Sequence, residues 1–208
     1  MYIKDGEYYH LHNKNAYPDL WKVDNIINFS NKTLNYFNYH YEKYSPKIIV
    51  DNIEYLPLEA LTVILNNNLH IQDKNYTDYV FKNIYAIVGE LGLFIREEIF
   101  EEIRKNYFPE LPSRKTCIWV FEKNAAKYWG EILSRDYELY KLELTGIMHK
   151  ADQKHLKNEI YSHEELKREA FNYWTGSDNK NQVEEELLFE GIVKIKEKYK
   201  DINEIISS

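Results

Sequence analysis

The sequence of 208 residues contains one cysteine, no glycine-rich loop and no long apolar run, and each of these absences excludes a class of protein. The single cysteine, Cys117, cannot form an internal disulfide or a cysteine-based zinc site. No stretch has the length of a membrane-spanning helix, and the first residues have no apolar segment of signal-peptide length. We therefore expect a cytoplasmic protein with no membrane partner.

An excess of basic residues is also missing. The chain has 27 lysines and arginines against 34 aspartates and glutamates, which gives a formal net charge of -7. Bulk charge therefore does not favour binding to polyanions, although a local basic groove stays possible. The Gly-x-Gly-x-x-Gly and Gly-x-Ser-x-Gly motifs are absent too. Neither a parallel-sheet nucleotide site nor a serine triad is expected.

The residues that are present predict a folded α+β protein. Hydrophobic residues make up 44% of the chain and aromatic residues 15%, too many for a disordered chain. The length suits one domain over residues 1–208, with a helical insertion at about 55–110 and a tail at about 197–208. Extended segments come first, helical segments follow, and strand, helix and strand patterns end the chain. This order predicts an α+β fold with helices inserted in its first half.

Local patterns predict several elements. Residues 1–12 are typical of a hairpin, with the turn at Asp5-Gly6. A strand is expected over 115–121, and another over 137–144 that Gly146 ends.

Helical spacing predicts a helix from Pro57 and a long one over 76–107, kinked or divided by its glycines. The charged run in the second half of the long helix is interpreted as a solvated face. Ser162 begins a further helix with a capping box that Glu165 completes, and Gly176 caps its end.

An acidic run comes directly before the last apolar strand, which is expected to begin at Val183. In a strand, Glu184 and Glu186 point to the same face, where their like charges repel each other. One interpretation is an exposed strand end with solvated charges, which is the usual reason for such a cluster. The other is an anionic site that recognises a cationic or hydroxylated group.

Four other residues are candidates for a site. His10 and His12 share one face of a strand and could ligate a metal, but no third ligand has a suitable spacing, so we expect no metal. A packed or surface histidine pair is the alternative. Arg114 could clamp a phosphate or form a surface salt bridge. Trp119 could form an aromatic floor or belong to the core.

Three segments carry a resemblance to a known family. The strand with His10 and His12 is similar to an aromatic-His-x-Thr/Ser strand. Residues 115–121, with 124–126 and Trp129-Gly130 after them, look like a middle strand and the helix packed behind it. Residues 186–189 look like a final catalytic strand, in which a glutamate precedes three apolar residues. Together these segments resemble the ADP-ribosyltransferase superfamily, in particular its small bacterial members of unknown function.

The resemblance implies a split antiparallel β-sheet core that binds NAD as a substrate and breaks the nicotinamide–ribose bond. Glu186 would be the catalytic carboxylate and would bond a ribose hydroxyl. His10 would hold the adenosine-side ribose or the nicotinamide amide, and Trp119 or a nearby tyrosine would stack on nicotinamide. We infer in addition, beyond what the family implies, that Arg114 would contact the pyrophosphate. A toxin-like or phage-defence effector, with an antitoxin or regulatory partner, would fit such an activity on a protein or nucleic-acid acceptor.

The sequence also departs from the family. His12 stands where the family has Thr or Ser, and no Ser-Thr-Ser middle motif is present. Either Glu184 or Glu186 could be the catalytic residue, because both point the same way in a strand. The alternatives are therefore an NAD hydrolase, an RNA phosphotransferase, and a non-catalytic interaction protein. In the last case, His10 and Glu186 would not lie in one cleft.

Overall fold

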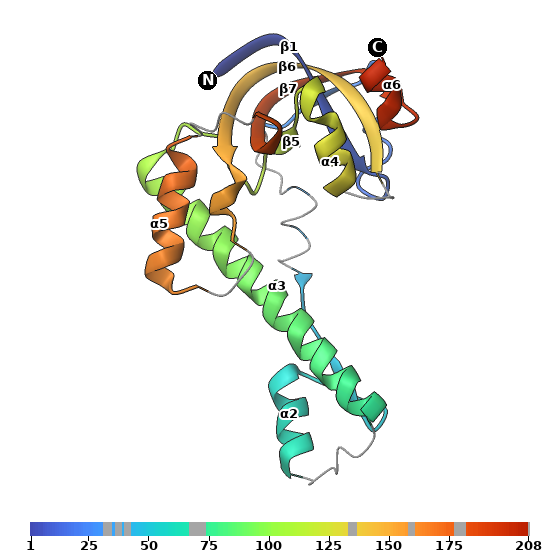
Figure 1. The fold of residues 1–208 in the computed structure, drawn as a ribbon, viewed down its shortest axis with the longest axis vertical. Coiled ribbons are helices and arrows are strands. Elements are labelled where there is room, and N and C mark those ends of the chain that lie inside the picture. Colours follow the sequence, from blue (N-terminus) through green and yellow to red (C-terminus); the bar gives the residue numbers. More distant parts are fainter. Residues whose placement is uncertain are drawn as a thin grey trace.

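The computed structural model describes residues 1–30, 35, 39, 43–66, 74–132, 137–157, 161–176 and 182–207. These residues form a mixed α+β structure with antiparallel sheets, as the order of sequence patterns predicted. Figure 1 shows the larger sheet at one end of the molecule and a long helix, α3, that extends away from it. The far end of α3 lies beside the helix α2 and a small two-stranded sheet.

The larger sheet has antiparallel pairing throughout and the strand order β1-β6-β7-β2, with β5 also paired to β7. Its strands are β1 (Tyr2–Asn13), β2 (Ile26–Asn28), β5 (Ile118–Val120), β6 (Tyr137–Asp152) and β7 (Glu185–Tyr199). Just after β5, Phe121 exchanges two backbone hydrogen bonds of 2.9 Å with Tyr9 of β1. These bonds bring β5 against β1, so the first, middle and last strands of the chain become neighbours.

The remaining elements cover the sheet or form the far end of the molecule. The α-helices are α2 (Pro57–Asn66), α3 (Lys74–Tyr107), α4 (Ala126–Ile132), α5 (His163–Trp174) and α6 (Ile202–Ser207). The small sheet consists of β3 (Ile48–Val50) and β4 (Ile53–Tyr55), and short 3-10 helices are η1 (Lys123–Ala125), η2 (Gln153–His155) and η3 (Gln182–Glu184). Among the described helices, none is both long enough and apolar enough to cross a membrane.

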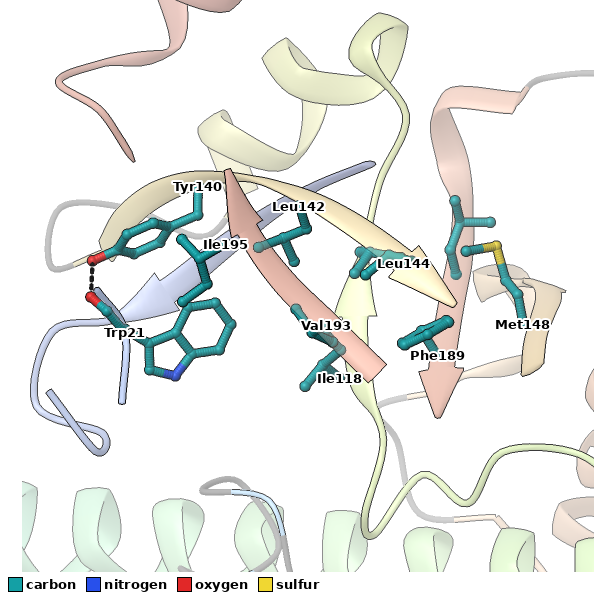
Figure 2. Packing of buried hydrophobic residues seen from close by; sticks show 11 residues of the cluster. Trp21, Ile118, Tyr140, Leu142, Leu144, Met148, Phe189, Val193 and Ile195 are labelled. Carbon is teal, nitrogen blue, oxygen red and sulfur yellow. Dashed lines mark hydrogen bonds between the residues drawn. The ribbon is translucent and has the colours of Figure 1, made fainter. Parts of the chain in front are cut away.

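Apolar side chains from β5, β6 and β7 fill the centre of the larger sheet (Figure 2). Leu142, Leu144 and Phe189 are completely buried there, as alternate positions on paired strands require. Trp21, in the segment between β1 and β2, closes one end of this core, and its carbonyl accepts a 3.0 Å hydrogen bond from the hydroxyl of Tyr140. The Trp21 indole is thereby fixed beside β1.

The hairpin expected over residues 1–12 is not formed. Strand β1 continues through Asp5, which has a φ of 53°, and the pairing with β6 shifts register between Ile3 and Gly6. The Asp-Gly pair therefore forms a β-bulge and not a turn. The strand finds a long partner 140 residues away, and this nonlocal pairing outweighs the local turn signal.

Gly146 does not end a strand either, because β6 runs on to Asp152. Gly146 lies opposite Gly191 of β7, and a Cβ atom on Gly146 would stand 2.3 Å from the carbonyl oxygen of Glu190. The two glycines allow a close approach of the strands that side chains would prevent.

Other local predictions have mixed outcomes. The helix from Pro57 and the capping box of Ser162 and Glu165 are confirmed, and Gly176 follows the end of α5 with a φ of 98°. Helix α3 is one continuous helix of 34 residues, undivided at its glycines. The strand expected over 115–121 is shorter, Ile118–Val120.

Candidate functional site

A cavity of about 990 Å³ opens beside β1, β5 and β7. Five residues singled out from the sequence line it: His10 and His12 of β1, Trp119 of β5, Glu186 of β7, and Arg114, which precedes β5. They lie up to 176 positions apart in the chain. The strand pairing described above is what brings them together.

The sixth residue singled out, Glu184, is not among those that line the cavity. It belongs to η3, ahead of β7, and its side chain is exposed. The expectation that Glu184 and Glu186 share a strand face is therefore wrong, because β7 begins only at Glu185. Glu186 is the carboxylate that the fold turns into the cavity.

Backbone contacts set His10 against β5. Its Nδ1 lies 2.7 Å from the carbonyl oxygen of Trp119. A carbonyl only accepts, so Nδ1 carries the proton and Nε2 of the neutral ring is an acceptor.

The two histidines stack on Trp21. The ring centroids of His10 and Trp21 are 4.6 Å apart and those of His12 and Trp21 are 4.2 Å apart, with the planes within about 26° of parallel. The Nε2 of His12 donates to the carbonyl of Ala16 at 2.5 Å. A packed histidine pair is thus what the structure contains, and the described residues hold no cluster of three or more side chains suited to a metal ion.

Both imidazoles are neutral at pH 7. Burial lowers the pKa of His10 to about 3, against the opposing effect of its bond to the Trp119 carbonyl. Burial likewise lowers the pKa of His12 to about 4. His10 therefore offers the cavity a neutral acceptor and no positive charge.

Arg114 is a buried residue of the cavity lining and forms an ion pair with Glu186. Its Nη1 donates to Oε2 of Glu186 and to the hydroxyl of Tyr173, the latter at 2.6 Å. The Tyr173 hydroxyl in turn donates to Oε2 of Glu186 at 2.7 Å. Two donors therefore fix one oxygen of Glu186, and the three side chains form a closed triangle of hydrogen bonds.

The other donors of Arg114 bind Glu97 of α3. Nε lies 2.8 Å from Oε2 of Glu97 and Nη2 lies 3.2 Å from its Oε1. Arg96 also donates to Glu97, with Nη2 2.8 Å from Oε1. Two arginines and two carboxylates thus balance their charges in a buried row that runs from α3 to β7.

The charged part of α3 is only in part the solvated face that the sequence suggested. Glu98, Glu102 and Lys105 are exposed, but the side chains of Arg96, Glu97 and Glu101 are buried. Burial opposes ionisation of Glu97, but the nearby guanidinium groups outweigh burial and hold its pKa below the usual value. Burial would lower the pKa of Arg114, yet its two carboxylate partners raise it well above normal.

A second buried carboxylate ties the same loop to α3. Glu101 accepts a 2.8 Å hydrogen bond from Oγ of Ser113, the residue before Arg114. Arg104 donates to Glu101 through two nitrogens, at 3.0 Å and 2.8 Å. The loop that carries Arg114 is thereby held on two successive turns of one helix.

The other oxygen of Glu186, Oε1, is not held by hydrogen bonds as Oε2 is. Within the described part of the chain, no donor forms a hydrogen bond with Oε1 of Glu186, and the side chain retains some exposure beside the cavity. Trp119, which is half-buried, lines the same cavity, and the guanidinium of Arg114 lies 5.7 Å from its ring centroid. A ligand in the cavity would meet a fixed carboxylate oxygen next to an aromatic ring.

Cys117 also borders this region but is completely buried. Burial raises the pKa of its thiol well above the ordinary value, so the thiolate that a nucleophile requires is not formed.

Three residues of the site were not singled out as site residues from the sequence: Trp21, Glu97 and Tyr173. A signal existed for Glu97, which follows Leu93 by four residues and precedes the buried Phe100 by three, so helical spacing places it on an inward face. No comparable signal marks the Tyr173 hydroxyl.

Residues 8–204 match a family described as a protein of unknown function (DUF2441), and the chain belongs to this family. No curated protein sequence matches the chain. The description of the family names no activity, so the chemistry of the cavity has to come from its own residues.

Proposed function

We propose that the protein is an ADP-ribosyltransferase that uses NAD as a substrate and transfers ADP-ribose to a protein or nucleic-acid acceptor. The observation that carries the proposal is the meeting of His10, Trp119 and Glu186 in one cavity. Each comes from one of the three strands on which the resemblance rests. A non-catalytic protein gives no reason for them to share a cleft.

The proposed reaction needs a stabilised cationic sugar. The bond between nicotinamide and C1′ of the ribose breaks, and nicotinamide leaves with the electron pair. Positive charge then develops on the ribose, and an acceptor nucleophile forms the new bond to C1′ and loses its proton. A carboxylate held beside C1′ stabilises this charge more in the transition state than in bound NAD, which raises the rate.

Glu186 is built for this role. Arg114 and Tyr173 hold Oε2, so Oε1 can accept a hydrogen bond from a ribose hydroxyl with little loss of side-chain freedom. We therefore assign Arg114 a positioning role. Four of its donor contacts are made to Glu97, Tyr173 and Glu186, which leaves it poorly suited to the pyrophosphate contact expected from the sequence.

The histidines and Trp119 would hold the ligand. Nε2 of His10 is an acceptor for a ribose hydroxyl or for the nicotinamide amide, and Trp119 offers its ring for stacking. His12 bonds the Ala16 carbonyl, so we assign it to the support of Trp21 and His10. The cavity volume lies at the upper end of the range of about 300–1,000 Å³ for small-molecule sites.

The cavity-lining residues in the described part of the chain argue against the RNA phosphotransferase alternative. The two arginines that reach the cavity, Arg96 and Arg114, each pair with a buried carboxylate. A site that binds an RNA phosphate as well as NAD needs basic groups whose charge is not already neutralised by a neighbouring carboxylate.

Incubation of the purified protein with NAD labelled in its adenylate part, with and without cell lysate, tests the proposal. Transfer of the label to a lysate component, lost in His10→Ala and Glu186→Gln, would support ADP-ribosylation and identify the acceptor. Nicotinamide release without transfer would indicate an NAD hydrolase. Failure of the folded protein to bind or consume NAD in either condition would overturn the proposal.

A further inference from the structure

The N-terminal half of α3 presents an exposed apolar stripe. Phe81 is 65% exposed, Tyr85 83%, Val88 42% and Ile95 50%. Together with Gly92 they follow one another at steps of four, three, four and three residues. This alternation keeps all five on one side of the helix and is the spacing of a seam between two helices. We call these five residues the α3 seam.

An adjacent side of this half of α3 already has a partner. Val80 and Ile87 are buried in a cluster with residues of β3 and α2. Toward the sheet, Ile99 follows Ile95 by four residues and is buried in the cluster that includes residues of α5. The α3 seam is therefore the continuation of a packing face beyond the end of α5.

Two glycines mark the same region of the helix. Glycine inside a helix is less favourable than alanine, yet α3 continues through Gly89 and Gly92. A Cβ atom added at Gly89 would meet no atom within 4 Å, so the fold itself gives no steric reason for that glycine. Close approach of another helix would supply one.

We propose that the α3 seam binds the α3 seam of a second copy of the chain, with the two helices antiparallel. A twofold axis between Tyr85 and Val88 sets Phe81 against Gly92 of the partner copy, and Tyr85 against Val88 of the partner copy. The two aromatic side chains then face the smaller Gly92 and Val88, as close packing requires, and Ile95 lies opposite Asp78 of the partner copy. A parallel pair would stack Tyr85 on its own copy and leave a gap at Gly92.

The surface involved is the size of a weak interface. With about 200 Å² for a whole aromatic side chain and somewhat less for an aliphatic one, the exposed parts of the seam and of the adjacent Leu91 amount to roughly 500 Å² per copy. A pair would bury about 1,000 Å² in all, which is the lower limit for a specific interface. The dimer should therefore form in a concentration-dependent way, with a Kd in the micromolar range.

Sedimentation velocity over a range of concentrations tests the proposal, with Tyr85→Glu as the disruptive variant. The matched control is Ala86→Glu, because Ala86 is exposed on the same helix but off the seam. We expect the wild type and Ala86→Glu to dimerise alike, and Tyr85→Glu to raise the Kd at least tenfold with unchanged circular dichroism. A wild type that stays monomeric throughout, or equal effects of the two substitutions, would overturn the proposal.

Disulfide trapping tests the orientation. Mixed Phe81→Cys and Gly92→Cys proteins should cross-link to each other under mild oxidation, whereas each alone should cross-link poorly. The native Cys117 is completely buried and should not interfere. Efficient cross-linking of each variant with itself would indicate a parallel pair and contradict the arrangement.

Discussion

The buried ion pair between Arg114 and Glu186 joins the loop before β5 to the start of β7, 72 residues further along the chain. Arg114 also binds Glu97 of α3, so one guanidinium links three separate parts of the fold. Its loss would leave Glu186 without its ion-pair partner and Glu97 with Arg96 alone, which costs far more than the loss of an exposed pair.

The first prediction follows from this arrangement. Arg114→Met should lower the free energy of unfolding by about 3–5 kcal/mol, measured by urea denaturation. The control is Lys167→Met, which removes a half-exposed ion pair with Glu102 and should cost about 1 kcal/mol or less. Equal effects of the two substitutions would contradict a central role for Arg114.

The second prediction concerns the loss of protein stability at acidic pH. His10, His12 and His149 have pKa values of about 3, 4 and 4 in the folded protein, in each case because burial disfavours the charged ring, against about 6.5 when unfolded. Below pH 6.5 the unfolded chain binds protons that the folded chain does not, so the free energy of unfolding falls as pH falls toward 4. Between pH 6.5 and 5 each histidine should contribute a loss of about 1–2 kcal/mol.

Urea denaturation at pH 7 and pH 5 measures this loss. His12→Phe keeps a ring against Trp21 but cannot titrate, so it should reduce the difference between the two pH values. A wild-type stability that is the same at pH 7 and pH 5 would show that the buried imidazoles do not control acid sensitivity.

The third prediction concerns the close approach of β6 and β7 at Gly146 and Gly191. Gly146→Ala should destabilise the protein by at least about 2 kcal/mol, because the added methyl group would overlap the Glu190 carbonyl and Gly191. Gly89→Ala, compared at a concentration at which the chain is monomeric, is the matched control, since within one copy open space surrounds that position, and helix propensity should make it neutral or stabilising by up to about 1 kcal/mol. A thermal shift of the same size and sign for both would refute the steric explanation.

Sequence reasoning succeeded where the signal is local. The capping box of Ser162 and Glu165 needs only four residues, and it forms as predicted. It failed at Asp5-Gly6, where a turn pair became a bulge because β1 pairs along its length with a distant strand. Pairing between distant strands is not visible in the local pattern of either strand.

In the candidate site, too, the features that depend on local patterns were predicted, and those that depend on contacts between distant segments were not. Alternation along β1 correctly set His10 and His12 on one face, and the acidic run pointed to β7. The identity of the cavity carboxylate depended on where β7 begins, which is uncertain by a residue or two in any prediction from pattern. Arg114 was singled out, but its partners Glu97 and Glu186 are set by the packing of α3 and β7 against one loop.

The most direct test of the proposed function is nicotinamide release from NAD by the wild type, Glu186→Gln and Glu184→Gln, each first checked for native folding. Glu186 lines the cavity, whereas Glu184, two residues away, is exposed in η3, so the two substitutions match in chemistry and differ only in place. We expect Glu186→Gln to lower kcat about 100-fold or more, and Glu184→Gln to leave it nearly unchanged. Equal turnover by all three proteins, or none by the wild type, would contradict the role of Glu186 in NAD cleavage.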